Sequence, residues 1–133
     1  MKLVRDPRSF QAPLDEAWAA SVRAAIAAGV VVHGAEARIR AALDERDALL
    51  RFVARIGELL RSEAFIDLPR QRRGTQIVPY CHHLTVGPWR GVFLVDPAGE
   101  LVVALLFSKA PHRLDERLDE LVLQYPFQTG EID

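Results

Sequence analysis

The sequence predicts a single α+β domain, with N-terminal helices packed on a small antiparallel sheet of three to four strands and a short C-terminal helix. Two observations support this. Apolar residues recur at helical spacing from Leu14 to about Arg61, and after Gln76 the pattern changes to short extended segments separated by Gly and Pro. The length of 133 residues, half of them hydrophobic, fits one domain over residues 1–133 that needs no metal or disulfide to hold its core.

Composition narrows the class of partner and the compartment. The formal net charge is -1, so no overall charge favours nucleic acid or a membrane surface. The single cysteine excludes an internal disulfide and suits a reducing compartment. The charged start MKLVRDPRSF lacks the apolar centre of a signal peptide, and the apolar runs are too short to cross a bilayer. We therefore expect a cytoplasmic protein with no membrane partner.

The first helix is expected after a short edge strand at residues 2–4. Proline is tolerated in the first turn of a helix, so Pro13 marks its start, and Asp15 and Glu16 complement the helix dipole there. Gly29 is a natural C-terminal stop. The apolar stripe of this helix consists of Leu14, Trp18, Val22 and Ile26.

A second helical stretch is expected from Gly34 to about Arg61. Asp44 is a suitable N-cap, so the stretch is either one helix or two that meet near Leu43. Residues 30–34 ahead of it are either a buried connector or a short strand, and the pattern does not decide between them. The predicted apolar stripe consists of Ile39, Leu43, Leu50, Val53, Ile56 and Leu60.

The second half of the chain is expected to form the sheet. Gly87-Pro88 and Pro97-Ala98-Gly99 are turn signals, so successive strands should be antiparallel. The third strand is uniformly apolar, as a central strand is. The strands are expected at residues 76–86, 89–96 and 100–107, followed by a short amphipathic helix at 114–123.

Local charge in the sheet region differs from the overall charge. Residues 70–113 carry six cationic side chains and two acidic ones, which gives +4. A basic patch on an otherwise acidic chain is a weak indication of a polyanionic partner. The cationic residues are Arg70, Arg72, Arg73, Arg90, Lys109 and Arg113.

The run Cys81-His82-His83 suggests a metal site only superficially. On a strand, Cys81 and His83 face one side and His82 faces the other, so further ligands from His33, His112 or an acid would be required. The simpler interpretation places Cys81 in the core with partly exposed histidines. We therefore expect no metal and no cofactor.

Imidazole and cationic groups should gather at one edge of this sheet. The end of the first strand, the start of the second and the end of the third meet there in a meander. Such a cluster suits a phosphodiester, because Arg and Lys neutralise the oxyanion and His moves protons near neutral pH. On these residues alone, a solvated face with arginines covering apolar surface is the favoured interpretation. The candidate residues are His82, His83, Arg90, Lys109, His112 and Arg113.

Residues 84–96, LTVGPWRGVFLVD, and 99–109, GELVVALLFSK, resemble the C-terminal sheet of the RelE/HigB toxin superfamily. The shared features are an aromatic-Arg pair that opens a strand, an acidic-Gly hairpin, an apolar strand and a basic loop. The resemblance covers about residues 76–120. It implies a toxin of a toxin-antitoxin system, a ribosome-dependent mRNA endoribonuclease that acts without metal and is inhibited by a cognate antitoxin.

The resemblance also implies roles for individual residues. Arg90 would stabilise the phosphate, His82 and His83 would act as base or charge stabiliser, and Lys109 matches the basic residue after the last long strand. His112 would act as acid. The implied RNA-binding residues are Arg70, Arg72, Arg73 and Arg113, with mRNA on the ribosome as the partner.

Two other functions stay open. The chain could be a non-catalytic protein-binding module, which an Arg90 paired with Asp96 or Glu100 on a flat surface would favour. It could instead be a small-ligand-binding domain, which a closed apolar pocket near Trp18 and Phe52 would favour. A cluster of Arg90, His83 or His82, and Lys109 on one concave face would favour the toxin hypothesis.

Overall fold

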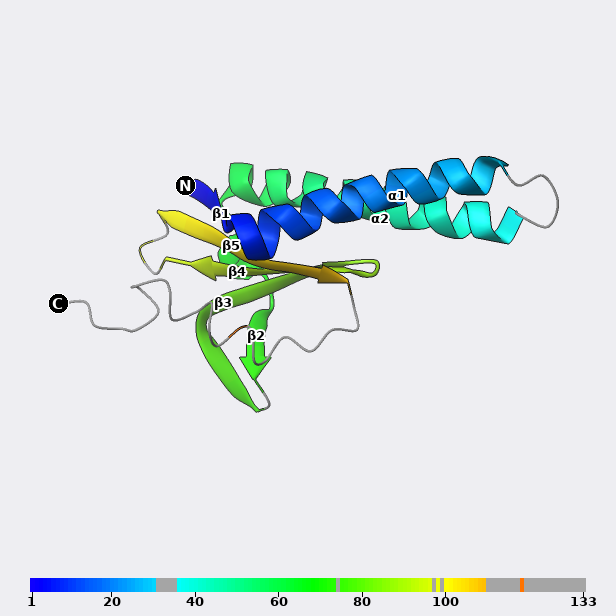
Figure 1. Ribbon diagram of the computed structural model, residues 1–133. Helices are drawn as coiled ribbons and strands as arrows, with labels where there is room; N and C mark the ends of the chain where they lie inside the picture. Colours follow the sequence, from blue (N-terminus) through cyan, green and yellow to red (C-terminus); the bar gives the residue numbers. More distant parts are fainter. Residues whose placement is uncertain (31–35, 74, 97, 99, 110–117, 119–133) are drawn as a thin grey trace.

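The structure is a computed structural model that describes residues 1–30, 36–73, 75–96, 98, 100–109 and 118. In this part of the chain, two long helices form a hairpin on one face of a five-stranded sheet (Figure 1). The elements in chain order are β1 (Lys2–Arg5), the π-helical turn η1 (Pro7–Gln11), α1 (Ala12–Val30), α2 (Glu36–Ser62), the 3-10 turn η2 (Phe65–Asp67), β2 (Arg70–Arg73), β3 (Gln76–Val86), β4 (Trp89–Val95) and β5 (Leu101–Lys109).

The sheet is mixed, with the strand order β1-β5-β4-β3-β2. The predicted α+β class and the three predicted strands are confirmed, as is the short first strand at an edge. The expectation of three to four strands, all antiparallel, is wrong. β1 pairs parallel to β5, with Lys2 opposite Leu101, because the α1–α2 hairpin carries the chain back to the same side before the meander begins.

The second edge strand, β2, is absent from the prediction. Its sequence, Arg-Gln-Arg-Arg, has no alternation of apolar and polar residues, and alternation is the signal that marks a half-buried strand. β2 pairs with the start of β3 and forms the outer edge of the sheet, where charged side chains are tolerated and block further pairing.

The main core lies between the helices and the sheet. Phe107 is its centre, since its ring stacks on Trp89 at 5.5 Å and meets Phe52 edge-on at 5.2 Å. Such aromatic pairs add about 0.5–1.5 kcal/mol each beyond the area that they bury. The buried residues of this cluster are Phe10, Ala48, Leu49, Phe52, Ile56, Leu59, Phe65, Leu68, Leu84, Trp89, Phe93, Val95, Val102, Ala104 and Phe107.

α2 is one continuous helix that passes through Asp44. The alternative of two helices that meet near Leu43 is therefore wrong. The apolar stripe predicted for α2 lies partly beside the face that the structure buries. The buried face consists of Ala48, Leu49, Phe52, Ile56 and Leu59. The prediction omitted Phe52, the largest apolar side chain of the helix. Consequently three of the predicted stripe residues are 41–48% exposed: Leu43, Leu50 and Val53.

Two glycines allow α2 to approach the β3–β4 hairpin closely. A Cβ at Gly91 would lie 2.7 Å from Cζ of Phe52, so only glycine leaves room for that ring over β4. Gly87 has a φ of 56°, and a Cβ there would lie 2.9 Å from the Cβ of Ala48. A positive φ followed by Pro88 fits the two-residue turn that hairpins prefer, as the sequence predicted.

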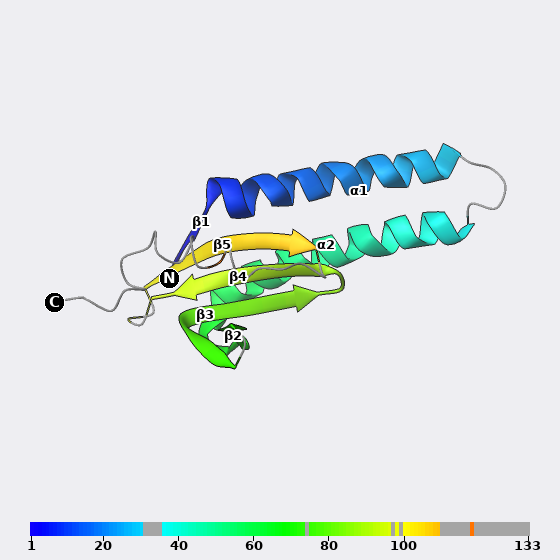
Figure 2. The same cartoon turned by 60° about the horizontal axis from the view of Figure 1, so that its bottom comes forward.

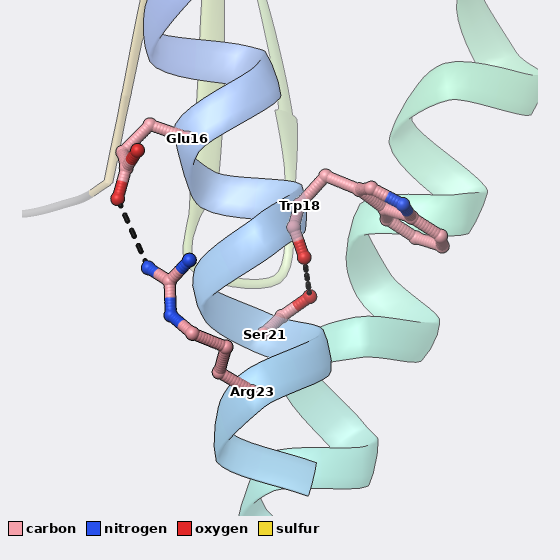
Figure 3. A network of polar contacts seen from close by, with 4 residues as sticks. All are labelled: Glu16, Trp18, Ser21 and Arg23. Atoms are coloured by element: carbon pink, nitrogen blue, oxygen red, sulfur yellow. Dashed lines mark hydrogen bonds and ion pairs between the residues drawn. The ribbon is translucent and has the colours of Figure 1, made fainter. Parts of the chain in front are cut away.

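The helical hairpin extends beyond the end of the sheet (Figures 1 and 2). Along α1, Ser21 Oγ donates to the carbonyl of Trp18 at 3.0 Å and Arg23 pairs with Glu16 at 3.1 Å (Figure 3). The ring of Trp18 points toward α2, where the Arg46 guanidinium lies 5.5 Å from its centroid. The Trp18–Arg46 contact therefore joins the two helices of the hairpin.

A second, smaller cluster covers the sheet face opposite the helices. Its buried members are Cys81, Val92, Leu94, Val103, Leu105, Leu106 and Leu118. Leu118 is the one described residue of the helix predicted at 114–123, so that helix lies outside the described residues, as do residues 31–35 of the uncertain connector. Within the described chain, no helix is both long and apolar enough to span a bilayer.

Candidate functional site

β3 contains a bulge against β2 just before its two histidines. Arg70 pairs with His82 but Arg72 pairs with Ile77, so β3 gains extra residues against β2 between these pairs. Tyr80 has a φ of 60° there, next to Pro79, which has no N–H for the ladder. Beyond the bulge β3 pairs regularly with β4, which fixes the faces of both histidines.

His82 belongs to the interior on the helix side of the sheet. It is 5% exposed, and its Nδ1 lies 2.9 Å from the carbonyl oxygen of Leu68. A buried ring with a main-chain partner is a structural feature of the β3–η2 junction. Of the two histidines of this strand, only His83 lines the cavity described next.

His83 and Arg90 share the sheet face opposite the helices. His83 lies opposite Val92 and Arg90 lies opposite Thr85, so the two are diagonal neighbours on adjacent strands. Both line a cavity of about 530 Å³ at the β2 edge. The other lining residues are Pro69, Arg70, Gln71, Arg72 and Ile77.

Two residues that line this cavity each carry a buried polar atom without a partner among the described residues. Nδ1 of His83 and Nε of Arg90 are inaccessible and have no hydrogen bond among the described residues. Buried polar atoms are normally paired, and each one that is not requires an explanation such as an absent ligand. Ser108 Oγ is in the same state; Ser108 pairs with Arg90 across β4 and β5 but lines the larger cavity described below.

The electrostatics keep the His83 imidazole neutral. Burial lowers the pKa of His83, and the positive charges of Arg90 and His82 lower it further. At neutral pH the ring can therefore accept a proton, while the adjacent guanidinium attracts an anion. A general base beside an oxyanion donor is what attack on a phosphodiester requires.

Lys109 does not join this site. Its Nζ lies 2.6 Å from Oε1 of Glu45 on α2 and 5.6 Å from the centroid of the Trp89 ring. Both partners belong to the helix side of the sheet, so Lys109 and Arg90 are on opposite faces. The expectation that they share one concave face is wrong, because Ser108, rather than Lys109, is the cross-strand partner of Arg90.

The other predicted residues fall into two groups. Arg70 and Arg72 are exposed and line the cavity, so they bring two further cations to Arg90 and His83. The backbone of Arg73 is part of β2, but its side chain is outside the description. His112 and Arg113 lie outside the described residues, so their predicted roles stay predictions.

Sequence reasoning missed Ser108, Gln71 and the bulge. The Gly87-Pro88 turn places Arg90 beside Thr85, but the place of Ser108 depends on the pairing of β4 with β5. The register between β4 and β5 shifts at Val92 and Phe93, and no sequence pattern reveals that shift. Gln71 is buried within a run of arginines, where composition gives no signal.

Cys81 has the structural place predicted for it. The thiol is buried in the second cluster, and burial raises its pKa to about 12, so it is inert at neutral pH. Among the described residues, no group of three His, Cys, Asp or Glu side chains could hold a metal ion.

A larger cavity of about 660 Å³ lies on the helix side, between α1 and the end of β5. Small residues of α1, including Ala17, Ala20 and Ala24, form one wall, and Trp89 and Phe107 contribute aromatic surface. Its polar residues include the Glu45–Lys109 pair.

Comparison with known proteins returns no relative. No protein-family model, no curated protein and no solved structure matches the chain.

Proposed function

We propose that the protein is a toxin of the RelE/HigB type, a ribosome-dependent mRNA endoribonuclease that holds the RNA phosphate in the cavity between β2 and β4. One observation carries the proposal. Arg90 and His83, two of the residues that the resemblance selects, line one cavity and each has a buried nitrogen without a partner among the described residues. Arg70 and Arg72 line the same cavity and add positive charge.

The chemistry follows from these groups. The neutral imidazole of His83 takes the proton of the RNA 2′-hydroxyl, whose oxygen then attacks the adjacent phosphorus. Arg90 stabilises the charge that develops on the phosphoryl oxygens. The bond from phosphorus to the 5′-oxygen breaks, leaving a 2′,3′-cyclic phosphate and a 5′-hydroxyl. His112 is the implied donor of the proton that the leaving oxygen takes, and Lys109 has no part because it faces the helices.

The test is cleavage of mRNA during translation. Wild-type protein added to a bacterial translation reaction should cut the mRNA inside the ribosome, which primer extension detects, and its expression should arrest growth. Arg90→Ala should lose both activities while keeping a cooperative thermal transition, and Lys109→Ala serves as the matched control. A wild-type protein that neither cuts translated mRNA nor arrests growth would remove the proposal.

A protein-binding function is the second candidate, and one observation favours it. The helical hairpin exposes several large apolar side chains, with Ile26 65% exposed on α1 and Val53 48% exposed on α2. Exposed apolar patches commonly mark protein interfaces. The cognate antitoxin that the toxin proposal requires would be such a partner, so a stable complex without RNA cleavage would favour the binding module alone.

The cavity beside Trp89 is the observation that favours a small-ligand-binding domain. It is open rather than closed, and it lies by Trp89 and Phe107 rather than by Trp18 and Phe52. A thermal-shift screen with apolar carboxylates would separate this candidate from the toxin, because a ligand in this cavity should stabilise Arg90→Ala as much as wild type.

A further inference from the structure

One edge of β5 is open beyond the end of β1. β1 pairs with β5 only as far as Ala104, whereas β5 continues to Lys109, and no other described strand pairs with the rest of this edge. Ser9 of η1 donates its hydroxyl hydrogen to the carbonyl of Leu105, so that carbonyl points away from β4. Because the backbone groups of successive strand residues point alternately to the two sides, the amide of Phe107 faces the same open edge.

The cavity of about 660 Å³ lies between this open edge and α1. α1 and β5 run side by side in the same direction (Figures 1 and 2). Ala17, Ala20 and Ala24 share one face of α1 and line the cavity, so α1 leaves open a space that larger side chains would fill. The rings of Trp89 and Phe107 line it from the sheet. A hollow of this size, mostly apolar and with a few polar groups, is typical of a small-molecule site.

The charged side chains that line the cavity leave one positive charge unpaired. Glu16 pairs with Arg23 at 3.1 Å, and Glu45 pairs with Lys109 at 2.6 Å. The remaining charged group is Arg8, which is exposed and whose guanidinium forms no ion pair with another described residue. The cavity is therefore complementary to a ligand with a single negative charge.

The donors for such an anion lie at the η1 end of the cavity. The hydroxyl groups of Ser9 and Ser21 also line it, but each already donates its hydrogen to a main-chain carbonyl. Ser9 holds η1 against Leu105, two residues before Phe107, so the guanidinium of Arg8 and the amide of Phe107 belong to the same end. A carboxylate accepts hydrogen bonds from both kinds of donor.

We propose that this cavity binds an apolar monocarboxylate. Its carboxylate accepts from Arg8 and from the amide of Phe107, and its apolar body lies between the alanine face of α1 and the ring of Trp89. The site does not depend on the proposed function, because it lies at the β5 edge of the sheet whereas the His83–Arg90 cavity lies at the β2 edge.

The test compares three probes that share one apolar body: 2-naphthylacetate, 2-naphthylacetamide and 2-(2-naphthyl)ethylamine. Isothermal titration calorimetry with the full chain should give the carboxylate a Kd of about 1 mM or lower. The amide should bind about 10-fold more weakly, because it lacks the charge, and the amine more weakly still. Changes in NMR chemical shift at Ala17, Ala20 and the Phe107 amide should locate the carboxylate.

Two pairs of variants test the charge and the space separately. Arg8→Gln should weaken the carboxylate about 10-fold and leave the amide unchanged, whereas Arg5→Gln removes the same charge from an exposed residue outside the cavity and should bind like wild type. Ala20→Phe puts a ring into the cavity and should abolish binding of both probes. Ala27→Phe adds the same ring at an exposed position of α1 outside the lining and should leave binding unchanged.

The outcomes decide the proposal. Absence of carboxylate binding by wild type at about 5 mM, or equal affinity for the carboxylate and the amide, overturns it. Binding that persists in Ala20→Phe, or shift changes confined to another surface, overturns the assigned cavity. If Ala20→Phe does not fold, the comparison of Arg8→Gln with Arg5→Gln decides. A wild type that binds the carboxylate but cleaves no mRNA overturns the proposed function and supports this site.

Discussion

Arg90 and Lys109 lie on opposite faces of the sheet, although β4 and β5 bring them within one register position of each other. Arg90 lies opposite Ser108, and Lys109 lies opposite Trp89, over whose ring its ammonium group sits. Successive residues of a strand alternate between faces, so one position separates a residue of the His83–Arg90 cavity from a residue of the helix interface.

Because Arg90 and Lys109 lie on opposite faces, removing their charges should have unequal effects on mRNA cleavage. Arg90→Ala should reduce mRNA cleavage by about 100-fold or more, because it removes an oxyanion donor. Lys109→Ala should leave the cleavage rate nearly unchanged and lower stability by no more than about 1 kcal/mol, since its ion pair with Glu45 is about half exposed. Single-turnover cleavage and urea denaturation of both variants measure these effects. A large loss of cleavage in Lys109→Ala would contradict the assignment of faces.

His83 should make stability depend on pH. Its native pKa lies below its ordinary value of 6.5, so between these two values the unfolded chain binds more protons than the folded one. Stability should therefore fall as the pH drops below about 6.5, and the fall should stop once the pH is below the native pKa. Denaturation of wild type and His83→Gln across this range tests the idea. An identical pH slope in the variant would show that another group is responsible.

The Phe52–Gly91 contact should not tolerate an added methyl group. Gly91→Ala would place its Cβ 2.7 Å from the Phe52 ring and should cost about 1–3 kcal/mol through overpacking. Gly57→Ala is the matched control, since its Cβ would meet only the tip of Arg61 at 3.4 Å and alanine favours the helix. The control should be as stable as wild type or more stable. Chemical denaturation of the two variants measures whether each substitution raises or lowers the free energy of unfolding.

The turn between β1 and α1 depends on Asp6. Its Oδ1 accepts from the amides of Arg8 and Ser9, at 3.0 and 2.9 Å, and so caps the η1 turn. Asp6→Ala should lower stability by about 0.5–2 kcal/mol, and Asp6→Asn by less because the amide oxygen still accepts. Equal stability of the two variants, compared by thermal denaturation, would argue that the cap is unimportant.

Leu105 should be intolerant of charge. It is fully buried in the cluster opposite the helices, so Leu105→Asp would bury an unpaired carboxylate and should prevent folding. Ile26→Asp makes the same kind of change at a side chain that is 65% exposed and should shift stability by no more than about 1 kcal/mol. Circular dichroism on heating compares the two. A cooperative transition in Leu105→Asp would place that residue outside the core.

Local signals predicted most of the secondary structure. Gly87-Pro88 gave the β3–β4 hairpin, and the apolar run after Leu101 gave the central strand β5. What they could not give was the pairing between distant segments. The parallel register of β1 on β5 and the polar strand β2 depend on the assembled sheet rather than on any local pattern.

The candidate site was predicted in part for the same reason. Arg90 and His83 come together as expected, since a two-residue turn fixes their register. Alternation along β3 places His82 on the other face, as predicted, and the register shift of β4 against β5 separates Lys109 from Arg90. That shift depends on packing that is visible only in three dimensions.

The parallel pairing of β1 with β5 also bears on the order of assembly. The first strand finds its neighbour only after a ribosome has synthesised residues 101–104, nearly at the end of the described chain. Until then the helices and the β2–β4 meander can form from nearer contacts, with β1 unpaired. We therefore expect the pairing of β1 with β5 to be the slow step of folding. A nascent chain halted before Leu101 should remain unable to complete its sheet.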